Sequence, residues 1–283
     1  MDTGPRPDLA SPASPLRRIP LRFPGVCVLC GTALAKGTEA LHDPATKTVR
    51  CLACPIPGTS STEPPIDHGI AGGSARLKYT RLVTKREAKA KDRFGDRLGG
   101  VILALTDEPQ STRAWAQGAR GEEELAESLA RVPGVAVLHD RQAPGTPANI
   151  DHLVVAPAGV FVVDAKGHQG MIRIRDRGGL FRTDLRLYVG HRDCSDLAED
   201  MGWQVAAVER VLRSADLKVM PPITPVLCFV NGEWPLFRPP DSYRGVRLES
   251  KRSIRELVTR GQVLDGAAIE RLTRILANAF PTK

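Results

Sequence analysis

Two short apolar runs separated by a turn are the feature that most constrains this fold. The runs cover residues 149–156 and 160–166, and both are rich in β-branched residues. Pro157-Ala158-Gly159 lies between them and supplies turn-forming residues. Short runs of this composition bounded by turn residues are typical of β-strands, so we expect one hairpin with its turn near Pro157-Ala158.

Each predicted strand carries an acidic residue where an apolar one would be usual. In this register Asp151 faces Asp164 across the hairpin, on the same side of the sheet, and Lys166 shares that side because side chains alternate along a strand. Two carboxylates with Cβ atoms about 5 Å apart repel each other, whereas a divalent cation between them makes the arrangement favourable. Lys166 would then face a phosphate or a water. The pattern predicts metal-dependent cleavage of nucleic acid.

The composition is that of a soluble protein with a basic surface. The chain has 283 residues, 42% of them hydrophobic, with a formal net charge of +8 and a pI near 9.4, which favours polyanionic partners. No apolar run approaches the roughly 20 residues that span a bilayer, and the proline-rich N-terminus lacks the apolar core of a secretion signal. We therefore expect a cytoplasmic protein without a membrane partner.

Four of the six cysteines form two close pairs. Cys27-x-x-Cys30 and Cys51-x-x-Cys54 are separated by twenty residues, which is the spacing of a four-thiolate zinc ribbon. The segment between the pairs is too short and polar to form a core alone, so bound zinc would supply its folding energy. Four protein ligands leave no open position for water, which indicates a structural site.

Other interpretations of the cysteines are less consistent with the sequence. A redox dithiol needs one pair and a thioredoxin-like context, and His42 between the pairs is a weaker ligand candidate. Cys228 has the surroundings of a buried small hydrophobic residue. Cys194 has His191 nearby in the sequence, but a cysteine-based hydrolase also needs a third group and a nucleophile signature, and neither accompanies this pair.

Composition changes along the chain predict five segments. These are a disordered tail (1–24), a zinc-ribbon-like module (25–56), a flexible linker (57–74), a basic helical arm and connector (75–108), and the main domain (109–283). Nine basic and three acidic side chains lie in 75–98, which therefore carries most of the net charge. A solvated helical spacer and a phosphate-contacting arm both fit this stretch.

The main domain alternates predicted helices and strands. We expect helices at 109–131, 195–213, 252–260 and 266–279, and strands at 135–139, 171–175, 180–183, 185–189, 224–230 and 245–248 in addition to the hairpin. Residues 101–105 fit a strand or a packing plug, and Trp115 is a candidate core residue of the first helix. This order is typical of an α/β fold with a central mixed sheet and helices on both faces.

Two further polar residues are candidates for the same site. Glu122 follows Gly121 on the first helix, and small residues beside it would let the helix approach the sheet closely. Gln204 lies at the flank of the apolar stripe of the 195–213 helix, where it could donate a hydrogen bond. A solvent-facing glutamate and an ordinary boundary glutamine are the alternatives. His152 points away from Asp151 by the strand period, which favours a core role.

These motifs resemble the NERD (nuclease-related) domain family, which is placed in the PD-(D/E)XK nuclease superfamily. The resemblance rests on Gly118-x-x-Gly121-Glu122, Ile150-Asp151-His152-Leu-Val-Val, Gly159-Val-Phe-Val-Val-Asp164-Ala-Lys166-Gly and Gln204, and it covers about residues 110–235. It implies a restriction-endonuclease-like central mixed sheet flanked by helices, with a small zinc ribbon ahead of it. One departure is Asp164, where the family more often has glutamate.

The resemblance implies a role for each candidate residue. Glu122, Asp151 and Asp164 would be acids that bind Mg²⁺ or Mn²⁺, Lys166 the catalytic lysine and Gln204 a supporting polar residue. Carboxylates, substrate phosphate and waters are the ligands that magnesium prefers, and the metal would lower the pKa of a bound water. We expect a nuclease that acts on DNA rather than RNA. The alternative is a catalytically silent protein that binds nucleic acid through the zinc ribbon and the basic arm.

Overall fold

The computed structural model describes residues 16–44, 46–54, 64–105, 107, 109–179 and 181–282, without the side chains of 96–105. The chain divides into two compact units, residues 1–65 and 66–283. The predicted linker covers the division; its residues 57–63, and residues 55 and 56 before it, lie outside the described part. Each unit is described by itself.

The first unit is built from five short strands. They are β1 (Arg17–Pro20), β2 (Gly25–Val26), β3 (Ala33–Leu34), β4 (Glu39–Asp43) and β5 (Thr48–Cys51). Strands β1, β4 and β5 form one antiparallel sheet and β2 and β3 a second, around a small core that includes Leu34 and Ala40. Strand β1 falls within residues 1–24, which were predicted to be disordered, so that prediction is wrong for this part of the tail. The strand is held by backbone pairing with β4, which the apolar pattern of the sequence does not indicate.

The second unit is centred on a six-stranded mixed sheet. Its strands, in spatial order, are β14 (Ser242–Tyr243), β15 (Val246–Glu249), β12 (Ile223–Phe229), β8 (Gly159–Lys166), β7 (Asn149–Ala156) and β6 (Ala136–Gln142). Strand β12 runs parallel to β8 and β15, while the pairs β6–β7, β7–β8 and β14–β15 are antiparallel. The α/β class with a central mixed sheet is confirmed.

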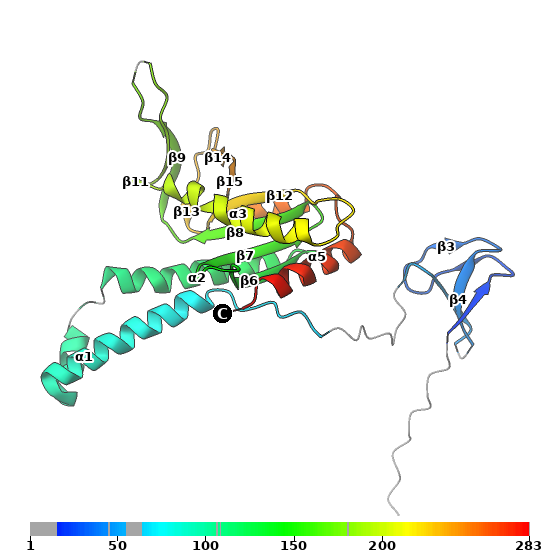
Figure 1. The fold of residues 1–283 in the computed structure, drawn as a ribbon, viewed down its shortest axis with the longest axis horizontal. Helices are drawn as coiled ribbons and strands as arrows, with labels where there is room; N and C mark the ends of the chain where they lie inside the picture. Colours follow the sequence, from blue (N-terminus) through cyan, green and yellow to red (C-terminus); the bar gives the residue numbers. More distant parts are fainter. Residues whose placement is uncertain are drawn as a thin grey trace, which may run out of the picture. The chain divides into compact units, whose positions relative to one another are not determined.

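Helices cover both faces of this sheet, as the element order predicted (Figure 1). Helix α2 (Gln110–Ala130) and helix α4 (Ser253–Thr259) pack with Val154, Phe161 and Val163 on one face. Helix α3 (Asp196–Ser214) and helix α5 (Gly266–Ala279) pack with Leu153, Val160 and Val162 on the other. Alternate residues of the β7–β8 hairpin therefore enter two different cores, which explains why both strands are apolar throughout.

A second, four-stranded sheet extends beyond the main one. It has the order β11 (Arg192–Asp193), β10 (Leu185–Val189), β9 (Gly170–Asp176) and β13 (Gly232–Glu233). The strand predicted at 180–183 is not found: Phe181 and Arg182 lie in the connection between β9 and β10, while Leu180 lies outside the described residues. The glycines of Arg177-Gly-Gly there favour a turn over a strand.

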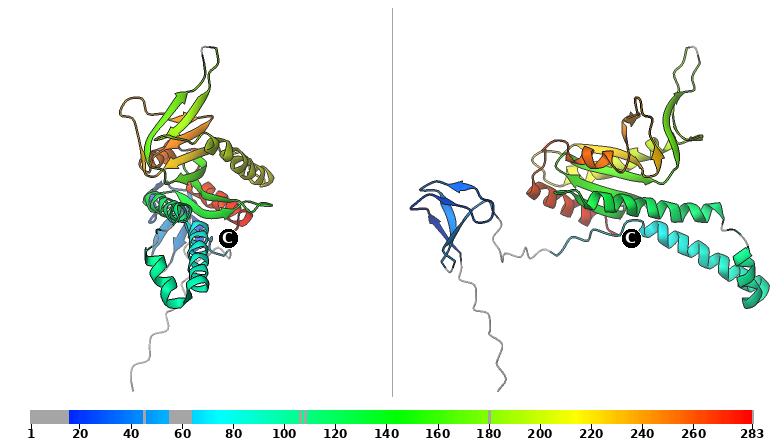
Figure 2. Two further views of the ribbon diagram at one scale, coloured as in Figure 1. Left: turned by 90° about the vertical axis from the view of Figure 1, so that its left-hand side faces the viewer. Right: turned by 180° about the vertical axis from the view of Figure 1, so that it is seen from behind.

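The basic arm forms helix α1 (Gly73–Leu105), which packs along α2 (Figure 2). Gly95 interrupts it with φ of 76°, a left-handed conformation that suits glycine. Residues 101–105, for which a strand or a packing plug was expected, are helical. Among the described helices, none combines the length and the apolar character that crossing a membrane requires.

The last residues of the predicted linker are ordered against β6. The backbone carbonyl of His68 accepts from the amide of His139 at 2.8 Å, and His68 Nδ1 lies 2.9 Å from the carbonyl oxygen of Val137. This segment extends the edge of the sheet and leads directly into α1. Its polar and glycine-rich sequence suggested flexibility, but backbone and side-chain groups of His68 bind the backbone of β6, and hydrophobic periodicity does not report such contacts.

Candidate active site at the end of the β7–β8 hairpin

The hairpin has the predicted register. Its ladder pairs Ala156 with Gly159 and continues to His152 with Val163, so the turn lies at Pro157-Ala158. The ladder ends one step before Asp151. There, Asp151 Oδ2 accepts a hydrogen bond from the backbone amide of Ala165 at 3.0 Å. The carboxylate thus takes the place of a ladder carbonyl and lies between the two diverging strands.

Asp164 is buried beside a lysine and a second carboxylate. Its exposed fraction is 6%, and Lys166 Nζ lies 2.5 Å from its Oδ1. Beyond this ion pair, no group among the described residues donates a hydrogen bond to this buried oxygen. Burial raises the pKa of Asp164 to about 7, the charge of Asp151 adds to this effect, and Lys166 opposes it.

Lys166 is placed to remain protonated. Burial acts to lower its pKa, but the neighbouring carboxylates of Asp164, Asp151 and Glu122 outweigh burial, so that the pKa lies above its usual value. A fixed positive charge at this position can stabilise negative charge that develops on a nearby phosphate.

Glu122 approaches the same group from α2. Its Oε2 accepts a hydrogen bond from the backbone amide of Gly72 at 3.1 Å. Its pKa is raised to about 9, mainly by burial and further by the negative charges of Asp151 and Asp140. A Cβ atom on Gly121 would lie 3.6 Å from Gly167 Cα, an ordinary van der Waals distance, so the helix passes close to the end of β8 as expected.

The two acids that follow Glu122 point elsewhere. Glu123 forms an ion pair with Arg76 of α1, and Glu124 Oε2 lies 2.5 Å from Lys251 Nζ. Both pairs lie at the surface. Of the three consecutive glutamates, Glu122 alone turns toward the hairpin.

A cavity of about 850 Å³ opens beside this group, and buried Asp164 lies outside its lining. The cavity lies between α2 and the segment that follows β8, and its lining includes Glu122, Asp151, Lys166, Arg113, Trp115 and Arg192. Trp115 was expected in the core but is 43% exposed, and Lys78 Nζ lies 6.0 Å from its ring centre. The side chain therefore contributes to the cavity wall instead of packing under the helix.

Gln117 is a residue of this site that sequence reasoning missed. Its Nε2 donates to the carbonyl oxygen of Gly167 at 2.6 Å, which holds the backbone after Lys166 against α2. His168 follows in the cavity lining, and burial, Arg192 and Lys166 together lower its pKa. A lone glutamine on a polar helix face gives no sequence signal for this contact.

Asp140 and Asn149 were also missed. Asp140 accepts from the backbone amide of Ser74 at 2.6 Å and from Asn149 Nδ2 at 2.5 Å, and the same Nδ2 lies 2.6 Å from Ser74 Oγ. Asp140 has φ of 49°, the left-handed conformation that aspartate and asparagine tolerate best. Together they fix the first turn of α1 beside Glu122.

Gln204 is not brought into the cavity. It is buried on α3 with an exposed fraction of 5%, its Oε1 has no hydrogen-bond partner in the described part of the chain, and it is absent from the cavity lining. His152 is fully buried, and its Nδ1 lies 2.8 Å from His139 Nδ1. The two histidines pack edge to face, which supports the expected core role of His152.

The four paired cysteines converge in the first unit. Their sulfur atoms lie within 4.8 Å of one another, with separations of 3.7 Å for Cys27–Cys54 and Cys30–Cys51 and 3.3 Å for Cys51–Cys54. A tetrahedral ion with Zn–S bonds of about 2.3 Å requires sulfur atoms roughly 3.8 Å apart. Amide hydrogen bonds, that of Cys51 first, lower the pKa of Cys27 to about 6, which favours the thiolate. The group could hold zinc.

The acidic group is less tightly assembled. Among the described residues, only the cysteines bring three or more ligand atoms within 4.8 Å of one another. The three acids are instead each held by a protein partner: Asp151 by the amide of Ala165, Asp164 by Lys166 and Glu122 by the amide of Gly72. Ionised carboxylates with free oxygen lone pairs suit a hard cation, and Asp164 Oδ1 retains such a lone pair.

Comparison with known families matches one part of this chain. The family model of the nuclease-related domain, NERD, matches residues 117–230, which include Glu122, the hairpin, strands β9 to β11 and α3. No curated protein and no solved structure matches the chain. The matched segment carries the whole acidic group and the lysine, and residues 117–230 are therefore a nuclease-related domain, preceded in the chain by a four-cysteine cluster with the geometry of a zinc ribbon.

Proposed function

We propose that this protein is a metal-dependent nuclease that hydrolyses phosphodiester bonds of DNA. One observation supports this most directly: three carboxylates from α2, β7 and β8 lie close enough to interact with one another and with a half-buried, protonated lysine. Glu122, Asp151 and Lys166 of this group line a cavity large enough for a nucleotide phosphate. A stable fold gains nothing from this arrangement, since repulsion and burial raise the pKa values of two of the acids.

Asp151 and Asp164 would hold a Mg²⁺ or Mn²⁺ ion, with Glu122 as the third acid. The bound metal would supply an activated water and neutralise charge on the scissile phosphate. Lys166 would donate to a non-bridging phosphate oxygen and stabilise the charge that grows there. Gln117 would act as a positioning residue, because it fixes the backbone of Gly167 next to this lysine.

Basic groups around the cavity favour a polyanionic substrate. Arg113 and Arg192 line it together with Lys166, and α1 adds Arg81, Lys85 and Lys89 along a helix that begins at the site. Lys and Arg contacts to phosphates supply the sequence-independent part of nucleic-acid affinity. DNA in preference to RNA is our expectation for the polymer, and zinc bound by Cys27, Cys30, Cys51 and Cys54 would stabilise the first unit.

A catalytically silent nucleic-acid-binding protein is the second candidate. The observation that favours it is that the carboxylate oxygens are each held by protein groups and do not converge as the cysteine sulfurs do. In that case the zinc ribbon and the basic α1 would bind nucleic acid, and the acids would be remnants. It predicts salt-dependent binding without turnover.

Loss of supercoiled plasmid separates the two candidates. We expect the full chain to nick or linearise plasmid with Mg²⁺ or Mn²⁺ and to leave it intact with EDTA. Asp164→Asn and Lys166→Ala should each abolish the loss, whereas Lys218→Ala, which removes an exposed lysine after α3, should retain it. Cleavage that survives both site variants would rule out this site, and no cleavage by the unaltered chain would favour the silent candidate.

A further inference from the structure

Strands β9 and β10 form a ribbon that projects from the body of the second unit (Figures 1 and 2). The two strands are antiparallel, with Ile172 paired to Val189 at the base and Asp176 to Leu185 farther out. Phe181 in the connection beyond them is fully exposed. Core packing does not explain the outer part of this ribbon, whose connection carries a fully exposed aromatic residue.

The two faces of the ribbon differ in chemistry. Ile172, Leu187 and Val189 are buried in the core that contains α3, with Ile174 packed against it. Because side chains alternate, the opposite face carries Arg173, Arg175, Arg186 and Tyr188. This set of four residues, here called the arginine face, faces away from α3.

The arginine face places like charges opposite each other. Arg175 is paired directly with Arg186 in the register, an arrangement that destabilises a sheet unless something compensates it. Arg186 is compensated, since its Nε lies 2.9 Å from Asp184 Oδ1. Arg175 has no carboxylate partner among the described residues, and its guanidinium stacks 5.3 Å from the ring centre of Tyr188. Arg173 also lacks a carboxylate partner in the described part of the chain.

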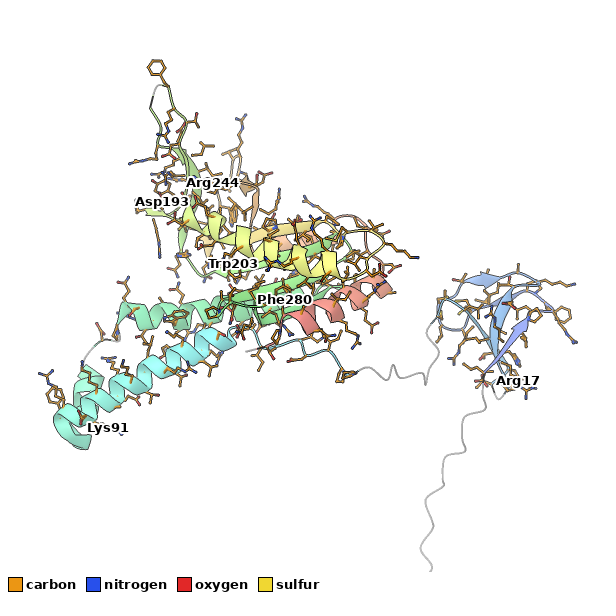
Figure 3. The ribbon with its side chains drawn as sticks, viewed as in Figure 1. Arg17, Lys91, Asp193, Trp203, Arg244 and Phe280 are labelled. Carbon is orange, nitrogen blue, oxygen red and sulfur yellow. The ribbon has the colours of Figure 1, made fainter. Side chains whose placement is uncertain are left out.

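The acids of the ribbon are already engaged. Asp176 accepts from the amides of Gly178 and Asp184 at 2.8 Å each, and Asp193 accepts from the amide and hydroxyl of Ser195. Figure 3 shows Asp193 and Arg244 at the base of the ribbon. The two hydrogen bonds from Ser195 lower the pKa of Asp193 most, and the charges of Arg186 and Arg244 add to this effect. The two charges of Arg173 and Arg175 are therefore left for an external anion.

The ribbon adjoins the candidate active site. Gln169, directly before β9, lines the cavity, and so does Arg192 of β11 in the same sheet. The ribbon and the α1–α2 pair project from the same end of the unit (Figure 1). The cavity lining joins them, because it includes residues of α2 and Gln169 before β9. A polymer whose phosphate enters the cavity would extend along one or both projections.

We propose that the arginine face of the β9–β10 ribbon binds the phosphate backbone of duplex nucleic acid next to the cavity. The inference rests on the proposed function for the identity of the polymer. Guanidinium groups bind phosphate through paired hydrogen bonds, and a two-stranded antiparallel ribbon fits a major groove about 12 Å wide. An acidic protein surface is the competing class of partner. We favour nucleic acid because its backbone repeats phosphates regularly, whereas a protein would have to place its carboxylates at the spacing of these arginines.

Salt-dependent binding of the full chain tests this proposal. A short labelled duplex and the matching single strand are titrated in EDTA, so that no cleavage occurs, between about 50 and 200 mM NaCl. For Arg173→Gln/Arg175→Gln we expect about tenfold weaker duplex binding and a slope of log K against log salt that is lower by about 1.8, since each lost phosphate contact removes about 0.9. Arg173→Lys/Arg175→Lys should restore the slope.

The matched control is Arg210→Gln/Arg213→Gln, which removes the same charge from the end of α3. These residues lie about 20–25 Å along the helix from Asp196 at 1.5 Å per residue, and their removal should leave slope and affinity unchanged. Three results would each overturn the proposal. The slope could be unchanged for a folded Arg173→Gln/Arg175→Gln variant, the variant could lose equal affinity for the single strand, or polyglutamate at equal charge could displace the duplex. A chain that binds duplex as described but cleaves no DNA would contradict the proposed function and leave this inference standing.

Discussion

Glu122 Oε2 accepts a hydrogen bond from the backbone amide of Gly72 at 3.1 Å, so one carboxylate both faces the candidate metal site and holds the start of the basic helix α1. Gly72 has φ of 72°, and a Cβ there would lie 2.8 Å from the carbonyl oxygen of Ala119. Only glycine allows this approach without displacing backbone. The docking of α1 and the charge state of Glu122 are therefore linked.

This link predicts a pH-dependent stability in the absence of metal. The pKa of Glu122 is about 9 in the folded chain, above its usual value, so the folded state binds this proton more tightly than the unfolded state does. Its stabilising contribution is complete below the unfolded pKa and is lost as pH rises toward 9, at a slope of at most about 1.4 kcal/mol per pH unit.

Urea unfolding of the chain at several pH values measures this loss. Glu122→Gln should reduce the decline between about pH 5 and pH 9, because the amide cannot ionise but can still accept from Gly72. Glu123→Gln, in the exposed pair with Arg76, is the matched control and should leave the pH profile as it is. Identical profiles for the unaltered chain and Glu122→Gln would disprove the raised pKa.

Metal binding should release protons. Asp164 has a pKa of about 7 and Glu122 a pKa of about 9, and both must ionise to act as ligands. Affinity for Mn²⁺ should therefore rise as pH increases from about 6 to 8.5, with about one or more protons released per ion near pH 7. Calorimetry in buffers of different ionisation enthalpy counts these protons, and binding with no release would show that the two acids are not ligands.

Removing the cap on α1 should destabilise the second unit. Asp140 accepts from the amide of Ser74 at 2.6 Å, the contact of a helix N-cap, and Asp140→Ala should cost about 1–2 kcal/mol of unfolding free energy. Asp140→Asn should recover part of this loss because its amide oxygen can accept the same bond. Asp216→Ala, at an exposed position after α3, serves as control; equal losses in Asp216→Ala and Asp140→Ala would argue against a specific cap.

Zinc should be required by the first unit alone. Cys30→Ser or a strong chelator should remove one zinc ion per chain. Residues 16–54 should then no longer show a cooperative unfolding transition, because the small core around Leu34 and Ala40 cannot keep this segment folded by itself. Unfolding of residues 66–283 should be unchanged. Cys194→Ala, whose thiol lies in a different core, should keep its zinc; zinc retained in Cys30→Ser would contradict the four-thiolate site.

Local patterns in the sequence predicted the hairpin and the faces it presents. The β-branched runs and the turn at Pro157-Ala158 specify the register, and the register brings Asp151, Asp164 and Lys166 to one end of the sheet. The flanking Gly121 correctly indicated that α2 passes close to β8. These features depend on neighbouring residues, which is why periodicity reports them.

The remainder depends on contacts between distant segments. Asp140 and Asn149 act through a left-handed backbone and a contact with Ser74 across more than sixty residues, and no local pattern encodes such a contact. Trp115 follows the helical apolar stripe, but it lines the cavity and so stays exposed. The hydrogen bond of Asp151 with the amide of Ala165 could not be predicted either, because it forms only where the β7–β8 ladder ends.

The most direct test is the position of Mn²⁺ in a crystal of the full chain, located by anomalous scattering. We predict a peak bound by carboxylate oxygens of both Asp151 and Asp164 at about 2.0–2.3 Å, at the cavity that Lys166 lines. A crystal soaked at saturating Mn²⁺ with no peak between these two residues would contradict the proposed metal site and, with it, the nuclease mechanism.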